Sequence, residues 1–305
     1  MKNVIVTGST SFIGISLCSA LLDKGYKVYA ITRLTSSNNK RLPQHQNLQI
    51  IYADLNNLTD VLNYKIENIE CFFHLGWDGI GVKGRNDINI QKKNIEYTLN
   101  SIRIASELNC KCFIQAGSQA EYGHVDGIIT EETICNPEIE YGKAKLETYY
   151  SGKSLCEKLG MKFLHLRIFS IYGENDHEWT LISTVVRNLI ENKDVHLSTC
   201  NQYWNFLYIK DAVQEIIGLS EFAITEILFK SEIYNIASDE TYLLKKYIDE
   251  IHEIIGGTGK LLYGDIDSSK LISIQPKVLK MKNTIGYDKQ YSFRMGIISI
   301  IKSLK

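Results

Sequence analysis

The sequence is poor in proline and has no excess of either charge. Three prolines in 305 residues leave no proline-rich linker, and we find neither internal repeats nor low-complexity segments. Lysine and arginine together number 34 against 35 acidic residues, which gives a net charge of −1. Because the chain has no overall positive field, we expect it to bind neither nucleic acid nor anionic lipid.

Long apolar segments are also missing. No stretch reaches the ~20 apolar residues that a membrane-spanning helix needs. The residues from Met1 to Gly8 enter directly into a short strand-like run and lack the apolar core and small-residue cleavage site of a secretory signal. We therefore expect a soluble, cytoplasmic protein with no membrane partner.

The cysteines do not form a pattern typical of metal or disulfide sites. There are seven of them, an odd number, and no CxxC pair occurs. The pair Cys110 and Cys112 is spaced too tightly for the common zinc sites and leads into an apolar strand. We expect reduced, mostly buried thiols and predict no metal site.

The apolar fraction of 44% is ample for a core, and it is arranged as alternating strands and helices. The strands predicted in the first half of the chain cover residues 4–7, 27–32, 48–52, 71–75, 112–116 and 162–169. The helices predicted there cover residues 12–24, 88–108 and 141–159. Short strands separated by helices predict βαβ units, and hence an α/β fold with a parallel sheet covered on both faces.

The second half of the chain is less regular. Helices are predicted at 181–191, 211–220, 242–255 and 295–303, and strands at 205–209 and 234–237. We predict one domain over residues 1–170, with a return of the chain around 205–237, and a second, smaller α/β lobe over residues 171–305. The boundary is expected near Ser170–Asp176.

A glycine-punctuated loop follows the first predicted strand and opens the first helix. Gly8 allows a sharp turn, and Gly14 allows the helix to pack closely on the sheet. Backbone N–H groups near Ser11, Phe12 and Ile13 can then face a pyrophosphate at the positive end of the helix. The loop therefore predicts a dinucleotide site, and the whole pattern predicts a Rossmann-type, doubly wound sheet.

The end of the second predicted strand bears on the choice of cofactor. Enzymes that use NAD usually place a carboxylate there for the ribose 2′-hydroxyl. This chain has Arg33 instead, followed by Ser36 and Ser37, and these residues suit a 2′-phosphate. NADP(H) is therefore favoured, with NAD(H) possible. After the third strand, Asp54 could accept a hydrogen bond from an adenine amino group or could cap a helix.

Tyr141 and Lys145 are four residues apart at the start of a predicted helix, so they share one face of it. An ammonium beside a phenol favours the phenolate, which lets the proton be exchanged at lower pH than usual. Such a pair is suited to general acid or base catalysis next to a carbonyl or an alcohol. Ser118, after an upstream strand, strengthens this interpretation.

Taken together, these motifs resemble the extended short-chain dehydrogenase/reductase family, in its nucleotide-sugar branch, over nearly the whole chain. The matching segments are the loop Thr7–Gly14, His74-Leu75-Gly76, Ala116–Gly123 with Ser118, Pro137–Lys145, Leu166–Gly173 and Gln202–Asp211. The resemblance implies that Tyr141 exchanges a proton with the sugar oxygen. It implies that Lys145 holds the nicotinamide ribose and keeps Tyr141 acidic, and that Ser118 donates a hydrogen bond to the same oxygen.

The resemblance also implies further contacts. Leu75 and Gly76 would line the cofactor, and Trp77 would lie near the nicotinamide. The helices at 88–108 and 141–159 would pair across a two-fold axis, so a homodimer is expected, although a monomer is not excluded by the sequence.

Several positions depart from the family pattern. Gln119 and Ala120 stand where enzymes that eliminate water across C5–C6 carry an Asp-Glu pair, so a 4,6-dehydratase would lack its acid and base. Ser170 stands where asparagine is frequent near the sugar diphosphate. Trp204 replaces a frequent arginine, and it could stack on a base or sugar or belong to the core. Candidates to replace the lost arginine are Arg187, Lys210, Lys282 and Arg294.

The narrowest resemblance is to enzymes that reduce 4-keto-6-deoxy nucleotide sugars. It rests on the segment Trp77–Arg85, on Gln91 and Asn94, and on the run Gly117–Gly123. The implied activity is NADPH-dependent reduction at C4 of a nucleoside-diphosphate sugar, for surface polysaccharide synthesis. Two alternatives remain open: an NAD-dependent nucleotide-sugar 4-epimerase, and a non-catalytic sensor or scaffold that binds NAD(P).

Overall fold

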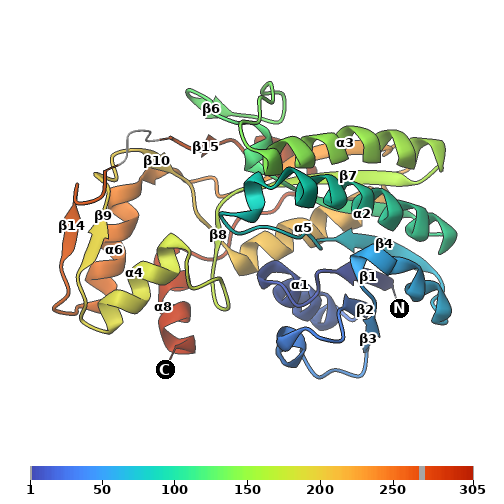
Figure 1. Ribbon diagram of the computed structural model, residues 1–305, viewed down its shortest axis with the longest axis horizontal. Coiled ribbons are helices and arrows are strands. Elements are labelled where there is room, and N and C mark those ends of the chain that lie inside the picture. The colour runs from blue at the N-terminus through green and yellow to red at the C-terminus, as the bar shows by residue number, and fades with distance from the viewer. Residues whose placement is uncertain (1, 268–271, 305) are drawn as a thin grey trace.

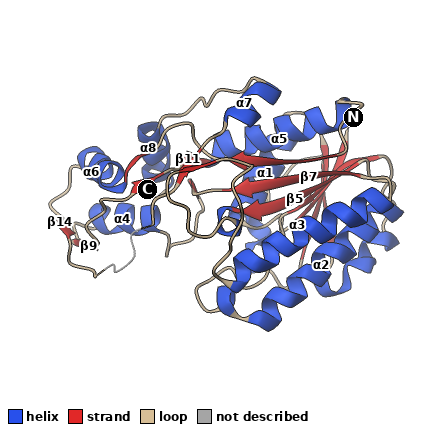
Figure 2. Ribbon diagram, turned by 90° about the horizontal axis from the view of Figure 1, so that it is seen from above, coloured by secondary structure: helices blue, strands red, loops and turns tan. Residues whose placement is uncertain are grey.

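The core of the protein is a seven-stranded parallel sheet. The computed structural model describes residues 2–267 and 272–304, and it places the strands in the order β12-β7-β5-β4-β1-β2-β3. Figure 2 shows strands of this sheet in red, with helices on both sides of them. Their bounds are β1 Asn3–Thr7, β2 Lys27–Thr32, β3 Leu48–Tyr52, β4 Ile69–His74, β5 Cys112–Ser118, β7 Lys162–Ile168 and β12 Ser231–Ile236. Every pairing in this sheet is parallel. The predicted α/β, doubly wound fold is confirmed.

The strands are apolar on both faces because helices cover both faces. In β1, Val4, Ile5 and Val6 are completely buried, as is usual for the inner strands of a parallel sheet. Helices α1 (Phe12–Asp23) and α5 (Ile209–Thr225) pack together on one face. Helices α2 (Ile88–Glu107) and α3 (Glu140–Lys158) pack together on the other face (Figure 1). The homodimer expected across α2 and α3 stays a prediction.

The strand order reverses between β1 and β4, and this position decides where a ligand can bind. The chain moves outward from β1 through β2 to β3 on one side, and from β4 through β5 to β7 on the other. Loops that leave the carboxyl ends of β1 and β4 therefore separate and leave a crevice, which is the usual ligand site of such sheets.

A second group of elements lies beside the carboxyl ends of the sheet strands. It contains α4 (Leu181–Ile190), α6 (Leu244–Ile255), α8 (Phe293–Ser303) and the parallel pair β9 (Val195–Leu197) and β14 (Leu261–Tyr263) (Figure 1). Short pairs join segments that are distant in sequence: β8 (Ile171–Tyr172) with β11 (Leu207–Tyr208), β10 (Tyr203–Trp204) with β13 (Tyr242–Leu243), and β6 (Ile128–Ile129) with β15 (Gln275–Pro276). Helix α7 (Leu279–Ile285) packs on α5.

The division into two lobes stays a prediction, and residues 1, 268–271 and 305 of those lobes lie outside the described residues. None of the helices among the described residues is long and apolar enough to cross a membrane. Within the same residues, no group of three or more histidine, cysteine or acidic side chains could hold a metal ion. The seven cysteines are free thiols, and all but the half-buried Cys135 are buried.

One local difference from the predicted elements is at residues 205–209. A strand was expected there, but only Leu207 and Tyr208 pair, and α5 begins at Ile209. The reason is the side chain of Asn205, which donates to the carbonyl oxygens of Ser238 and Glu240 and accepts from the Ser238 N–H. These bonds hold Asn205 in a buried loop contact, so it does not join a ladder.

Candidate nucleotide-binding and active site

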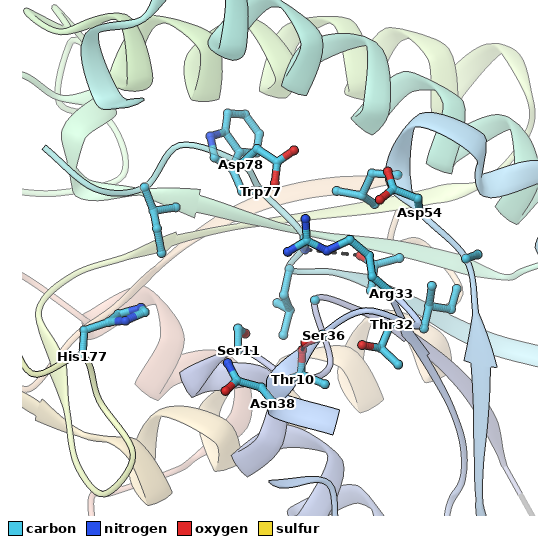
Figure 3. Close-up of a pocket in the computed structure, with 18 residues that line it drawn as sticks. Thr10, Ser11, Thr32, Arg33, Ser36, Asn38, Asp54, Trp77, Asp78 and His177 are labelled. Carbon is cyan, nitrogen blue, oxygen red and sulfur yellow. Dashed lines mark hydrogen bonds between the residues drawn. The ribbon is translucent and has the colours of Figure 1, made fainter. Parts of the chain in front are cut away.

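Two adjoining cavities occupy the crevice at the carboxyl ends of the central strands. The first has a volume of about 300 Å³ and is surrounded by the loops after β1, β2, β3 and β4 (Figure 3). The second has a volume of about 290 Å³ and reaches the end of β5 and the start of α3. Both are lined by Ser11, Leu75, Trp77, Ile80 and His177, so the two cavities lie next to each other in the crevice.

The glycine loop is built for close approach of backbone to backbone. Gly8 has a φ of +65°, and a Cβ atom there would lie 2.7 Å from the Gly76 nitrogen in the neighbouring loop. A Cβ atom at Gly14 would collide with the Gly8 carbonyl oxygen. Ser11 stands where the family pattern has glycine, and its hydroxyl caps α1 by accepting from the Gly14 N–H at 3.1 Å. The loop is therefore compact, and the first turn of α1 opens on the cleft.

Most of the residues predicted to bind the cofactor lie around the cleft. Those lining the first cavity are Gly8, Ser11, Arg33, Asp54, Leu75 and Gly76. Those lining the second cavity include Phe12, Ile13 and Leu75. Gly14 lines neither cavity and acts through the close contact with Gly8.

The side chains after β2 make one end of the first cavity polar and basic. Arg33 and Asn38 are exposed there, and Ser36 lies 3.5 Å from the Thr10 hydroxyl; Figure 3 shows these side chains around the cavity. Asp54 caps the short helix Leu55–Asn63 by accepting from the Asn56 N–H. It also lines the cavity, and its contact with an adenine amino group stays a prediction.

Ser118, Tyr141 and Lys145 line the second cavity together. Tyr141 lies in the first turn of α3, and Lys145 lies one turn later. The Lys145 ammonium donates to the Ala116 carbonyl oxygen at 2.6 Å and lies 3.5 Å from the centre of the Trp77 ring. Its distance to the centre of the Tyr141 ring is 5.7 Å. The ammonium therefore points past the phenol ring towards the end of β5.

The sequence predicted that Lys145 acidifies the phenol, and the structure adds two further groups that act on its pKa. Burial raises the pKa of Tyr141, and the Ser118 hydroxyl and the Arg85 guanidinium act against that increase. Burial lowers the pKa of Lys145 to about 7. A lowered pKa reduces the positive charge that Lys145 carries near neutral pH, compared with an exposed lysine.

The backbone of Ser118 is hydrogen-bonded to a buried network of charged side chains, which was not predicted from the sequence. The Ser118 N–H donates to Glu121 Oε1 at 2.8 Å, and Glu121 is completely buried. The same carboxylate accepts from Arg167 Nε at 2.8 Å and contacts His165 Nε2 at 3.0 Å. Glu121 is the acid nearest to the position of a dehydratase base, but these contacts occupy it inside the protein. A possible signal in the sequence was the pair His165 and Arg167, whose side chains share one face of β7.

The residues predicted to bind substrate are only partly brought together. Trp77 and Gln119 line the second cavity, whereas Ser170, Arg187 and Trp204 line neither cavity. The Ser170 carbonyl oxygen accepts from the Leu207 N–H, and Arg187 forms an ion pair with Glu178 at 3.2 Å. Trp204 packs partly buried on the core, next to Phe206.

Two further cleft residues come from the loop between β8 and α4. The His177 ring is stacked on the Trp179 ring, with 5.0 Å between centroids. His177 lines both cavities and Trp179 lines the second. Their place just after the predicted boundary at Ser170–Asp176 was the available signal, because ligands often bind where two lobes meet.

Comparisons with known proteins identify the family of this chain and agree with its fold. The model of the "NAD dependent epimerase/dehydratase family" matches residues 4–237. The chain is 26% identical to an uncharacterized UDP-glucose epimerase, YtcB, of Bacillus subtilis, covering 99% of this chain and 97% of that protein. It is 27% identical to a dTDP-6-deoxy-L-talose 4-dehydrogenase (NAD(+)) of Aggregatibacter actinomycetemcomitans, over 81% and 88% of the two chains.

Among solved structures, the fold is similar to that of UDP-glucuronic acid 4-epimerase from Bacillus cereus, solved with UDP-glucuronic acid and NAD. The TM-score is 0.86 at 22% identity, and the match covers 99% of this chain and 100% of the other.

Proposed function

Because the chain belongs to the NAD dependent epimerase/dehydratase family, of the extended short-chain dehydrogenase/reductase type, we propose that it reduces the C4 keto group of a nucleoside-diphosphate 4-keto-6-deoxysugar. It is an NAD(P)-dependent enzyme. The observation that carries the proposal is that Ser118, Tyr141 and Lys145 line one cavity, next to the cavity at the glycine loop.

The cleft suits a dinucleotide along its length. A Cβ atom at Gly8 would meet Gly76, and one at Gly14 would meet Gly8, so both positions need glycine. With no side chain at these two positions, a pyrophosphate could approach the backbone at the start of α1. Lys145 and Trp77 would then lie near the nicotinamide end, with Arg33 at the adenosine end. Bound NADPH would supply a hydride to C4.

The chain's own residues would handle the oxygen of the sugar. Tyr141 would give its proton to O4, and the Ser118 hydroxyl would donate a hydrogen bond to the same atom as negative charge develops. The network of Glu121, His165 and Arg167 would keep Ser118 in place. Lys145 would hold the nicotinamide ribose and contribute positive charge.

Three features support a 6-deoxysugar reduced at C4. Ile80, Ile168, Phe169 and Trp179 give the second cavity apolar walls that suit a C6 methyl group. Gln119 and Ala120 supply no acid–base pair for dehydration. The relative from A. actinomycetemcomitans is named for oxidation at C4 of a dTDP-6-deoxysugar, which is the same chemistry in reverse. The product would serve surface polysaccharide synthesis.

The decisive experiment combines the protein with NADPH and a panel of dTDP-, CDP- and GDP-linked 4-keto-6-deoxysugars. We expect loss of nicotinamide absorbance in proportion to substrate, and one C4 alcohol configuration by product NMR. A 4-epimerase would instead interconvert 4-hydroxy nucleotide sugars with no net consumption of NADPH. A sensor or scaffold would bind NADPH and leave every sugar unchanged. Either result would contradict the proposed reduction.

The preference for NADPH is proposed from Arg33. Arg33→Gln should weaken NADPH binding by about tenfold or more, since it removes a charged partner of the 2′-phosphate worth at least ~1.4 kcal/mol. NADH binding should change little. Binding is measured by titrating nicotinamide fluorescence, with Lys40→Gln, an exposed neighbour outside both cavities, as the matched control. An equal loss of affinity for the two cofactors would contradict the preference.

A further inference from the structure

Arg85 is a second cation at the predicted reaction centre. It lies in the short helix Gly84–Asn86, and its Cζ atom is 4.6 Å from the centre of the Tyr141 ring. It lines the second cavity together with Ser118 and Gln119. Its Nε atom is buried and has no hydrogen-bond partner among the described residues. The guanidinium lies against a phenol, and it forms no ion pair with a carboxylate in the part of the chain that the structure describes.

The loop that carries Arg85 is fixed to α2 by side chains of that helix. Gln91 accepts from the Trp77 indole N–H at 3.0 Å and donates to the Gly84 carbonyl oxygen at 2.9 Å. Asn94 accepts from the Asp78 N–H and donates to the Asp78 carbonyl oxygen, both at 2.9 Å. These hydrogen bonds fix the loop on α2, and the fixed loop places Arg85 beside Tyr141.

The backbone of the same loop also packs against itself, at Gly79 and Gly84. A Cβ atom at Gly84 would collide with the Gly79 Cα atom, so the two ends of the loop touch. This close contact explains why glycine occurs at both positions, and it fixes the direction in which the chain leaves towards Arg85.

The charged and titratable groups facing Tyr141 come from every element around it. Glu121, behind Ser118 at the end of β5, acts to raise the pKa of the phenol, as burial does, while Ser118 and Arg85 act to lower it. Lys145, on the same helix as Tyr141, bonds to Ala116, and His177 lines the cavity from the β8–α4 loop. An arginine guanidinium stays charged throughout the working pH range, whereas burial lowers the pKa of Lys145 to about 7.

We propose that Arg85 is a positioning residue that supplies the permanent positive charge beside the Tyr141 phenol. Lys145 is left to hold the nicotinamide ribose, in keeping with its bond to the end of β5 and its reduced basicity. The inference rests on the role proposed for Tyr141. It assigns to the loop Trp77–Asn86 a task in proton transfer, in addition to forming the wall of the cleft.

The test measures ionisation of Tyr141 directly and does not require a known sugar. The protein with NADP⁺ bound is labelled with ring-fluorinated tyrosine, which ionises at lower pH than tyrosine, and its fluorine NMR signals are titrated. The Tyr141 signal is identified by its loss in Tyr141→Phe. Arg85→Met removes the charge, Arg85→Lys keeps it, and Arg85→Gln provides a second neutral variant if Arg85→Met does not fold. Arg103→Met, on the exposed side of α2, is the control.

We expect Arg85→Met and Arg85→Gln to move the Tyr141 midpoint upward by about one pH unit or more, as for loss of an opposite charge at this distance. Arg85→Lys should move it by less than half of that shift, and Arg103→Met should not move it. A midpoint in Arg85→Met within about 0.3 pH units of wild type would overturn the proposal.

A second readout separates charge from structure once a substrate is known. Oxidation of the C4 alcohol needs the ionised phenol. The acid limb of the pH–rate profile for this oxidation should therefore move to higher pH in Arg85→Met, by the same amount as the NMR midpoint. A loss of rate at every pH with an unmoved limb would overturn the proposal. If wild type turns over no sugar, the proposed function fails and the NMR titration still decides the role of Arg85.

Discussion

Tyr141→Phe is expected to slow the reduction of 4-keto nucleotide sugars by about 10²–10⁴-fold, the usual contribution of a positioned general acid. The substitution removes only the hydroxyl. The ring that contacts Trp77 edge-on and lies under the Arg85 guanidinium is retained. NADPH affinity should therefore remain close to that of wild type, and the loss should appear in kcat.

The measurement is the rate of NADPH consumption at saturating sugar, with cofactor binding followed separately by fluorescence. Tyr150→Phe is the matched control, because Tyr150 lies two turns later on α3 with 60% of its surface exposed. If Tyr141→Phe turned over as fast as the control, the phenol could not be the proton donor. If both variants lost cofactor binding, the effect would be structural.

The second large effect concerns stability. Glu121→Ala should lower the free energy of unfolding by about 3–5 kcal/mol, because it leaves the buried Arg167 charge without its partner. The same change leaves the Ser118 N–H without an acceptor and opens space beside Gly117, where a Cβ atom would already meet Glu121 and His165. Urea unfolding measures the loss, and Glu147→Ala, exposed on α3, should change it by no more than about 0.5 kcal/mol.

The contribution of Glu121 also depends on pH. Burial alone would raise its pKa, but His165 and Arg167 outweigh burial and hold the pKa below the ordinary value of 4.5. The unfolded chain therefore binds this proton at higher pH than the folded protein does. The stabilisation is complete above about pH 4.5 and is lost as the pH falls through the folded pKa. The difference in free energy of unfolding between wild type and Glu121→Gln should therefore become smaller as the pH falls through that acid range. A difference that stays constant would contradict a lowered pKa for Glu121.

The central sheet and the glycine loop could be predicted from the sequence because their signals are local. β1, β2, β4 and β5 are short apolar runs next to helical segments, and Gly8 and Gly14 follow the first run directly. The periodicity of apolar residues and the positions of glycines depend only on residues close in sequence, so they can be recognised without knowledge of the fold. The placement of Ser118, Tyr141 and Lys145 near one another required the family resemblance as well, since β5 and α3 are separated by a long loop.

The rest depends on contacts between distant residues. Glu121 could be taken for a surface acid until β7 brings His165 and Arg167 against it. Arg85 stands in a glycine-rich stretch, and its contact with Tyr141 exists only because Gln91 and Asn94 fold that stretch onto α2. Arg187 and Trp204 were candidates by residue type, but their neighbours Glu178 and Phe206 hold them elsewhere. No local pattern reports such partners.

The position of β12 has a consequence for synthesis of the protein. This strand pairs with β7 along its whole length, and the chain reaches it only after the α4 and α5 segments have been made. Until then, β7 is an edge strand with unpaired backbone groups, and most of its side chains are ones that the finished fold buries. Such an edge can pair with strands from other chains. A ribosome-bound intermediate that ends before residue 231 should therefore require a chaperone, and a gene fragment cut at the end of β7 should yield an insoluble product.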